Sequence, residues 1–181
     1  MKLTSRSMAE IAGHEGVVLE AYKDSVGVWT WGVGLTNFSG HKVYPRYKDN
    51  PQTLQKVIDV FEFILRKKYL PDVLAAFKGH DLTENELAAA VSFHYNTGGI
   101  KRASWVKTFL KGDVAGAKIQ FMAWKKPPSI IKRREAERDL FFGGAWGDGN
   151  AQIIPVKKPS YKPDFKNAKT VKVDEILELN K

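Results

Sequence analysis

The sequence predicts a mostly helical α+β fold, and two stretches of the chain carry this prediction. Residues 22–44 are rich in glycine, aromatic and β-branched residues, which is typical of a small antiparallel sheet. From residue 54 onward, apolar residues recur at helical spacing, and capping signals separate the runs. The chain has 181 residues, a length that suits one well-buried core.

A short helix is expected ahead of the sheet region. Ser7 and Glu10 have the spacing of a capping box, in which each side chain satisfies a free backbone amide. Gly16 accepts the backbone conformation found after many helix ends. The sequence therefore predicts a helix that begins near Ser7 and ends near Glu15.

The sheet region follows at once. Residues 24–27 have the composition of a turn, and residues 28–31 form a β-branched and aromatic run that favours a strand. Gly32 and Gly34 then permit close backbone approach. We expect a small, strongly twisted antiparallel sheet here.

A long helix is predicted next, because apolar residues line one face over four turns. Pro71 disfavours its continuation, so we expect this helix to span Leu54–Leu70. Capping signals then predict four further helices. They begin after Thr83 (closed by Gly98–Gly99), at Ser104, at Asp113, and at Ile130, the last running to about Phe141.

The composition shifts again near the C-terminus. Residues 150–181 are basic and carry prolines at every fourth position from Pro155 to Pro163, a pattern that disfavours helix. We therefore expect a main domain over residues 1–149 and a C-terminal extension over 150–181, which either packs on that domain or forms a tail. Asp174–Leu179 has the pattern of one or two helical turns.

Composition excludes several classes of function. The absence of cysteine excludes disulfide frameworks, thiol nucleophiles and cysteine-bound zinc. The four histidines lack the spacing of metal ligands, so we expect no metal. The sequence has no apolar run long enough for a membrane helix or a signal peptide, so we expect neither. The net charge of +9 predicts attraction to polyanions.

Glu15, Asp24 and Thr30 form the main candidate constellation. A helix followed directly by a hairpin can bring two acids together, with a hydroxyl beside the second. Glycosidic cleavage needs such a pair: one carboxylic acid to protonate the leaving oxygen and one carboxylate to direct water. On spacing alone, ordinary structural roles are the more common explanation, since acids at helix ends and in turns are frequent.

The flanking residues resemble a known signature. The segments 14–16 and 19–34 closely resemble the amino-terminal motif of the phage-type lysozymes, glycoside hydrolase family 24, with eight residues between Glu15 and Asp24 and five between Asp24 and Thr30. Residues 92–98 resemble the aromatic-Asn-x-Gly segment of that family, and residues 133–140 its paired-arginine last helix. The resemblance covers roughly residues 7–145.

The resemblance implies a two-lobed lysozyme-like fold, with a small antiparallel sheet lobe, a larger helical lobe, the Leu54–Leu70 helix joining them and a cleft between. It also implies that Glu15 is the general acid, that Asp24 orients a water which Thr30 helps to hold, and that the anomeric centre is inverted. Glu15 must then be protonated at the working pH while Asp24 is ionised.

Substrate contacts are expected from Trp31, Asn96 and Arg134. An aromatic face suits the apolar side of a pyranose, and an amide suits an acetamido group. A packed strand residue is the alternative for Trp31, and the sequence leaves open whether Arg133 or Arg134 faces Glu15.

Two departures from the family pattern stand out. Leu35 replaces a usual histidine, which concerns local stability rather than chemistry. Pro127–Pro128 stiffens a loop that is often glycine-rich, so the cleft wall there is expected to differ in shape.

The leading hypothesis is an endolysin, a muramidase that cleaves the β-1,4 bond between N-acetylmuramic acid and N-acetylglucosamine in peptidoglycan, causing host lysis without a cofactor. A lytic transglycosylase is an alternative, although a water-positioning pair favours hydrolysis. A third hypothesis is a non-catalytic module that binds wall or nucleic acid through basic residues. The cluster at 125–134 is interrupted at once by acids, so we expect no nucleic-acid partner.

The expected partners are peptidoglycan and anionic cell-envelope polymers. We expect a monomer that accumulates in the host bacterial cytoplasm and acts at the periplasm or cell wall after release through a separate pore-forming protein.

Overall fold

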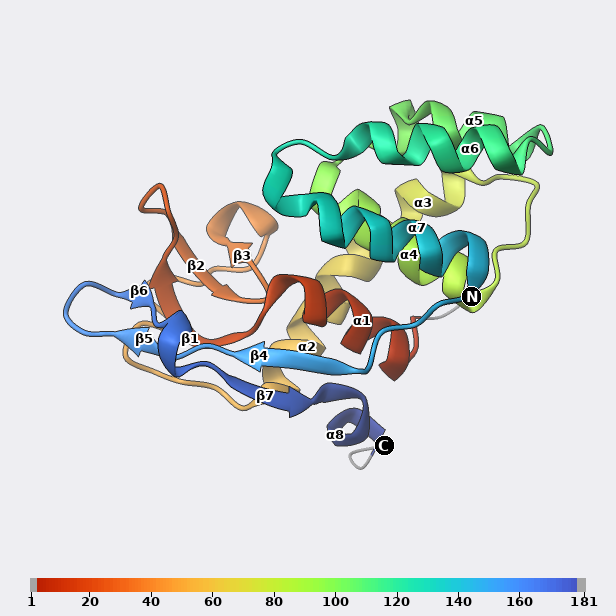
Figure 1. Ribbon diagram of the computed structural model, residues 1–181. Coiled ribbons are helices and arrows are strands. Elements are labelled where there is room, and N and C mark those ends of the chain that lie inside the picture. The colour runs from red at the N-terminus through yellow and green to blue at the C-terminus, as the bar shows by residue number, and fades with distance from the viewer. Residues whose placement is uncertain (1–2, 179–181) are drawn as a thin grey trace. The chain divides into compact units, whose positions relative to one another are not determined.

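The computed structural model describes residues 3–178 and divides the chain into two compact units (Figure 1). The sheet unit comprises residues 4–64 and 148–178, so it joins the two ends of the described chain. The helical unit comprises Leu3 and residues 65–147. The mostly helical α+β prediction is confirmed. Within residues 3–178, no helix combines the length and apolar character needed to cross a membrane.

The sheet unit begins with a helix followed by a three-stranded antiparallel sheet in the order β1-β2-β3. Its N-terminal elements are α1 (Ser5–Glu15), β1 (Val18–Lys23), β2 (Trp29–Gly32), β3 (Leu35–Thr36), a 3-10 turn (Asn37–Ser39) and α2 (Leu54–Ile64). The sheet therefore starts at Val18, a few residues earlier than the composition indicated.

Helix α1 is capped differently from the prediction. Thr4 is the N-cap, and its hydroxyl accepts a hydrogen bond from the Ser7 amide at 3.1 Å. Ser7 is buried inside the helix, so the expected capping box at Ser7 is wrong. The end of the helix at Glu15 is confirmed, and the Gly16 amide donates to the Ala12 carbonyl with φ of 72° at the glycine.

The C-terminal extension, residues 150–178 of the described chain, packs within the sheet unit. It forms two short antiparallel pairs, β4 with β7 and β5 with β6, and ends in a helix. Its elements are β4 (Asn150–Ile153), β5 (Val156–Lys157), β6 (Lys162–Pro163), a 3-10 turn (Phe165–Asn167), β7 (Lys169–Lys172) and α8 (Val173–Glu178). The helical turns expected near Asp174 are present, and Leu179 lies outside the described residues.

The helical unit is built from five α-helices preceded by a π-helical turn. The main elements are the π turn (Leu65–Tyr69), α3 (Leu70–Ala76), α4 (Glu84–Thr97), α5 (Ser104–Leu110), α6 (Val114–Phe121) and α7 (Ile131–Gly143), with 3-10 turns at Ile100–Arg102, Met122–Trp124 and Pro128–Ile130. Helix α7 confirms the final charged helix within two residues at each end.

The long helix does not end before Pro71. Helix α2 passes through the π turn into α3, so helical structure continues to Ala76. Pro71 lies in the first turn of α3, where its missing amide proton costs nothing. The predicted end at Leu70 is therefore wrong, although the chain does pass between the two units through this helical stretch.

Of the other predicted helix caps, those at Thr83 and Asp113 are confirmed and the one at Ser104 is wrong. Thr83 and Glu86 form the predicted capping box of α4, and the Asp113 carboxylate accepts from the Gly116 amide at 2.8 Å. Ser104, in contrast, is the first residue of α5 and makes no capping bond, because Ala103 occupies the N-cap.

Aromatic side chains fill the core of the helical unit. Phe93 and Trp105 meet with ring centroids 5.4 Å apart in an edge arrangement, and Phe121 packs against both. All three are fully buried. Packing of this kind holds the four-turn helix α4 against its neighbours.

Candidate active site

The three predicted catalytic residues lie at the ends of adjoining elements of the sheet unit. Glu15 is the last residue of α1, and Asp24 directly follows β1. Thr30 lies in β2, paired with Tyr22 of β1 in the antiparallel register. All three therefore belong to one helix–hairpin segment, as the sequence predicted.

The Asp24 carboxylate is held by its own turn. Its Oδ1 atom accepts hydrogen bonds from the amides of Val26 at 3.0 Å and Val28 at 2.8 Å. The Asp24 amide in turn donates to the Val28 carbonyl at 3.0 Å. One carboxylate oxygen thus fixes the side chain, and this anchoring orients the second oxygen.

The Thr30 side chain is buried, with 4% of its surface exposed. Its hydroxyl donates to the Val28 carbonyl at 3.1 Å. Because the hydroxyl proton is used in this bond, the oxygen is left with acceptor lone pairs. The side chains of Thr30 and Asp24 therefore both bond to Val28, the first to its carbonyl and the second to its amide.

A pocket of about 380 Å³ in the sheet unit brings the two candidate acids together. Glu15 and Asp24 both line it, whereas Thr30 is not among its lining residues. Pockets of this size commonly bind small molecules or single sugar units. The remaining wall is formed by Val18, Tyr22, Lys23, Ser25, Ile154, Lys162, Pro163 and Phe165.

Tyr22 is a site residue that the sequence analysis missed. Burial, followed by the negative charges of Asp24 and Glu15, raises the pKa of Tyr22 to about 12. The phenol therefore stays neutral at physiological pH and offers a hydrogen-bond donor beside two carboxyl groups. Its position two residues before Asp24 on a strand is the signal that could have found it, since such residues share a face.

Trp31 does not present its ring to a sugar in this structure. The side chain has no exposed surface, its Nε1 donates to the Leu19 carbonyl at 3.0 Å, and its ring stacks on Tyr47 with centroids 3.9 Å apart. The expected sugar contact is therefore replaced by the alternative, a packed strand residue. Burial of the ring also fixes strand β2, and with it Thr30.

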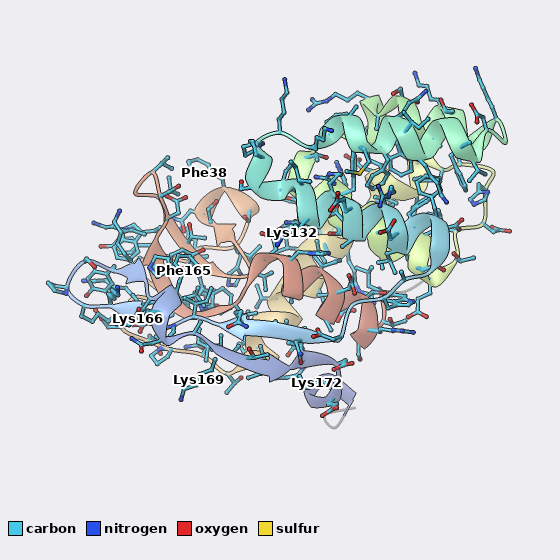
Figure 2. The ribbon with its side chains drawn as sticks, viewed as in Figure 1. Phe38, Lys132, Phe165, Lys166, Lys169 and Lys172 are labelled. Atoms are coloured by element: carbon cyan, nitrogen blue, oxygen red, sulfur yellow. The ribbon has the colours of Figure 1, made fainter. Side chains whose placement is uncertain are left out.

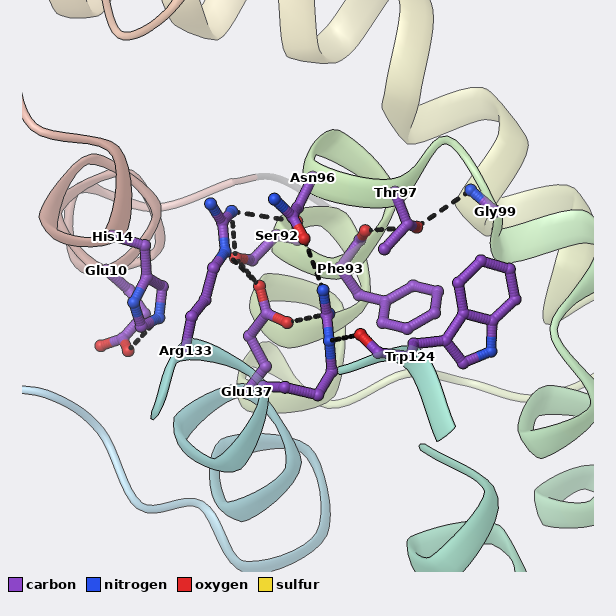
Figure 3. Close-up of polar contacts among 11 residues, drawn as sticks. Glu10, His14, Ser92, Phe93, Asn96, Thr97, Gly99, Trp124, Arg133 and Glu137 are labelled. Carbon is purple, nitrogen blue, oxygen red and sulfur yellow. Dashed lines mark hydrogen bonds and ion pairs between the residues drawn. The ribbon is translucent and has the colours of Figure 1, made fainter. Parts of the chain in front are cut away.

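Arg134 is likewise a structural residue of the helical unit. It is fully buried, pairs with Glu137, and donates to the Asn96 Oδ1 at 2.5 Å and to the Trp124 carbonyl at 3.0 Å. These three partners are labelled in Figure 3. Burial lowers its pKa, while the charge of Glu137 opposes this shift. A guanidinium enclosed in this way cannot contact substrate directly, so the expected role is corrected.

Arg133 joins the same network from the other side. Its Nε donates to Glu137 at 2.9 Å and its Nη2 to the Ser92 hydroxyl at 3.2 Å. Ser92 donates to Glu137 at 2.6 Å. The paired arginines and Glu137 thus tie α7 to α4, and the arrangement orients Asn96.

Asn96 lines a second pocket of about 600 Å³, which lies within the helical unit. Thr97, Trp124 and Lys126 are among its neighbours there. Because the Asn96 Oδ1 accepts from Arg134, its amide NH₂ is the part that a sugar could use.

The two departures in sequence have simple structural settings. Leu35 is completely buried in β3, where an aliphatic side chain needs no polar partner. Pro128 begins a 3-10 turn that leads into α7, and Pro127 also lines the second pocket.

A comparison with protein families decides the assignment. The family model described as phage lysozyme matches residues 12–137, more than half of the chain and including Glu15, Asp24 and Thr30. The chain belongs to the phage lysozyme family. As a phage lysozyme it is a glycoside hydrolase of the endolysin type, a muramidase that degrades peptidoglycan and lyses the cell.

Individual phage lysozymes and endolysins resemble the whole matched region. An endolysin of Acyrthosiphon pisum secondary endosymbiont phage 1 is 28% identical over 153 residues, covering 78% of this chain and 98% of the relative. An endolysin of Salmonella phage P22 is 29% identical over 150 residues, with the same coverage. The solved endolysin from Escherichia coli O157:H7 phage FAHEc1 shares the fold, with a TM-score of 0.72, 24% identity, and coverage of 82% of this chain and 98% of that structure.

Proposed function

We propose that this phage lysozyme hydrolyses the β-1,4 bond between N-acetylmuramic acid and N-acetylglucosamine with inversion, using Glu15 as general acid. Asp24 acts as the base that orients water, and Thr30 helps to hold that water. The observation that carries the proposal is that Glu15 and Asp24 line one pocket. The anchored turn of Asp24 and the helix end at Glu15 supply the rigid positioning that such a pair requires.

The proposed reaction is a single displacement. Glu15 gives its proton to the glycosidic oxygen as the bond from that oxygen to the anomeric carbon breaks. A water molecule attacks the anomeric carbon from the opposite face, and Asp24 takes the proton that the water loses. The buried Thr30 oxygen, whose own proton is directed to Val28, can accept a hydrogen bond from that water.

Analysis of the products tests this proposal. Digestion of peptidoglycan should give reducing muropeptides, and NMR of the first product formed should show the α-anomer of the newly released reducing end. A first product with retained β configuration would contradict inversion. A non-reducing product about 18 Da lighter would instead identify a lytic transglycosylase, because that reaction closes an anhydro ring without water.

The cellular setting extends the proposal. We infer that the protein gathers in the host cytoplasm, reaches the wall through a separate pore-forming protein, and is held there as a monomer by anionic envelope polymers. The net charge of +9 supports the last point. Fractionation of cells that express the protein alone should find it in the cytoplasm, and export without an accessory protein would contradict this route.

A further inference from the structure

The C-terminal extension reaches the pocket that contains the candidate acids. It lies beyond the matched residues 12–137, so it is an addition to the part of the chain that carries the family pattern. Four residues of the extension form part of the pocket wall: Ile154, Lys162, Pro163 and Phe165. Figure 2 shows Phe165 beside β1 and β6, the strands that supply Tyr22, Lys23, Lys162 and Pro163 to the same wall.

Backbone hydrogen bonds hold the extension in place along the segment that holds the candidate acids. The Val17 amide donates to the Gln152 carbonyl at 2.8 Å, and the Ile154 amide donates to the Val17 carbonyl at 2.8 Å. Further along, the Lys23 amide donates to the Tyr161 carbonyl at 2.7 Å. These bonds attach the extension just after Glu15 and just before Asp24, so its position relative to both acids is fixed.

Side-chain contacts also hold the stretch around Lys158 and Tyr161 in place. Lys158 pairs with Glu20 at 2.7 Å and also with Asp49, and the Tyr161 hydroxyl donates to Asp49 at 2.8 Å. The hydrogen bonds from Lys158 and Tyr161 lower the pKa of the Asp49 carboxyl. The Tyr161 ring also meets Trp29 edge-on, with centroids 5.2 Å apart. The segment from Ile154 to Phe165 is therefore a defined wall.

Phe165 is the unusual member of this wall. It lies in a 3-10 turn with 71% of its surface exposed, although a large aromatic side chain is costly to leave in water. An exposed aromatic face at the edge of a pocket is the arrangement that suits the apolar side of a pyranose ring. Lys162, also exposed, brings a second cation to a pocket that is also lined by Lys23 and by the two acids.

We propose that the C-terminal extension supplies a substrate subsite: Phe165 stacks on a sugar ring next to the bond that is cleaved, and Lys162 binds a carboxylate attached to the glycan. Peptidoglycan offers two carboxylate sources: the peptide stem, and the lactyl group of muramic acid on units that carry no stem, since an attached stem converts the lactyl carboxyl into an amide. This inference rests on the proposed function, because it places the subsite beside Glu15 and Asp24.

Steady-state kinetics of full-length variants test the subsite. Phe165→Ala should raise KM for glycan strands about threefold to tenfold with kcat nearly unchanged, the effect expected from losing one aromatic contact made equally in ground and transition states. Phe165→Tyr should restore the parent KM, because it keeps the ring. An unchanged KM in Phe165→Ala would overturn the stacking role.

Three glycan preparations test the carboxylate contact and identify its source: strands with peptide stems, strands freed of stems by an amidase, and strands whose carboxylates are capped as amides. Lys162→Gln should raise KM at least threefold on the strands with stems, on the strands without stems, or on both. It should leave KM on the capped strands unchanged. An effect only with stems assigns the peptide carboxylate, and an effect only without them assigns the lactyl group. An equal effect on all three would overturn the contact.

Lys166→Gln is the matched control, because Lys166 is an exposed neighbour that does not line the pocket and its loss changes the net charge equally. It should leave KM within twofold of the parent at the same ionic strength. A rise equal to that of Lys162→Gln would overturn the subsite in favour of general charge attraction. Glu15→Gln, assayed alongside, separates the proposed catalytic role from the proposed subsite. Normal turnover in that variant would refute the catalytic role of Glu15, whatever KM values the Phe165 and Lys162 variants show.

Discussion

The phenol of Tyr22 is largely buried and lies near the negative charges of Asp24 and Glu15. The pH at which it loses its proton should therefore report on these surroundings. A pKa raised from 10 to about 12 in the folded state means that the folded protein holds this proton more tightly than the unfolded chain. The resulting stability is fully present below pH 10 and is lost as the pH rises toward 12.

Comparison of the parent with Tyr22→Phe isolates this contribution. Between pH 9 and 11, the free energy of unfolding should fall about 1 kcal/mol more steeply in the parent than in the variant. Urea unfolding at each pH, followed by circular dichroism, measures the difference. Parallel pH profiles would show that neither burial nor the charges of Asp24 and Glu15 raise the pKa of Tyr22 in the folded protein.

Glu137 offers a test of the buried ion pair at residue scale. Its replacement by glutamine leaves the enclosed Arg134 without a charged partner, so Glu137→Gln should lower the free energy of unfolding by about 3 kcal/mol. Glu135→Gln, an exposed neighbour on the same helix, should change it by less than about 0.5 kcal/mol. Equal small losses in urea unfolding would contradict the structural role of Arg134.

The residue scale also shows what the sequence could supply. The spacing of Glu15, Asp24 and Thr30 matches a family pattern, so the sequence alone predicts these three as the catalytic set. The sequence predicts substrate contacts for Trp31 and Arg134, whereas the structure buries both side chains. The residue type alone does not show whether a side chain will be exposed or enclosed. Only the fold reveals that Tyr47 covers Trp31 and that Glu137 pairs with Arg134.

At the scale of elements, local signals located helices and strands better than they located ends. Thr4 and Ser7 are both competent caps, and the burial of Ser7 inside α1 excludes it. Pro71 disfavours the continuation of a helix, yet a proline is equally suited to the first turn of a new one, and α3 begins directly after the π turn. The attachment of the C-terminal extension to Val17 and Lys23 could not be predicted, because contacts between segments so far apart in the sequence leave no local signal.

Removal of the C-terminal extension should lower the stability of the folded protein. Ile154 and Val173 are buried, so a chain that ends at Gly149 loses both and exposes the surface they cover on the sheet unit. Burial of two aliphatic side chains contributes about 3–6 kcal/mol to the free energy of unfolding, so the melting temperature should fall by about 10 °C or more. A calorimetric melting temperature within 2 °C of the parent would show that the extension is a loose tail. Wall affinity should be measured separately at a temperature where both proteins are folded.

At the scale of the whole molecule, the net charge of +9 should act over distance. Attraction to anionic walls is screened within about 8–10 Å at 0.1–0.15 M salt. Between 0.05 and 0.5 M NaCl, lysis of intact walls should therefore slow severalfold more than cleavage of short soluble glycan substrates. Turbidity assays and chromatography of the products give the two rates. Equal salt sensitivity would remove the role assigned to net charge.

Glu15 carries the central claim, and one substitution tests it most directly. Glu15→Gln keeps the size of the side chain but cannot donate the proton that the leaving oxygen requires. The initial rate of peptidoglycan solubilisation should fall by about 10²–10⁴-fold, while circular dichroism and the melting temperature match the parent. Solubilisation at the parent rate by the folded variant would contradict the account.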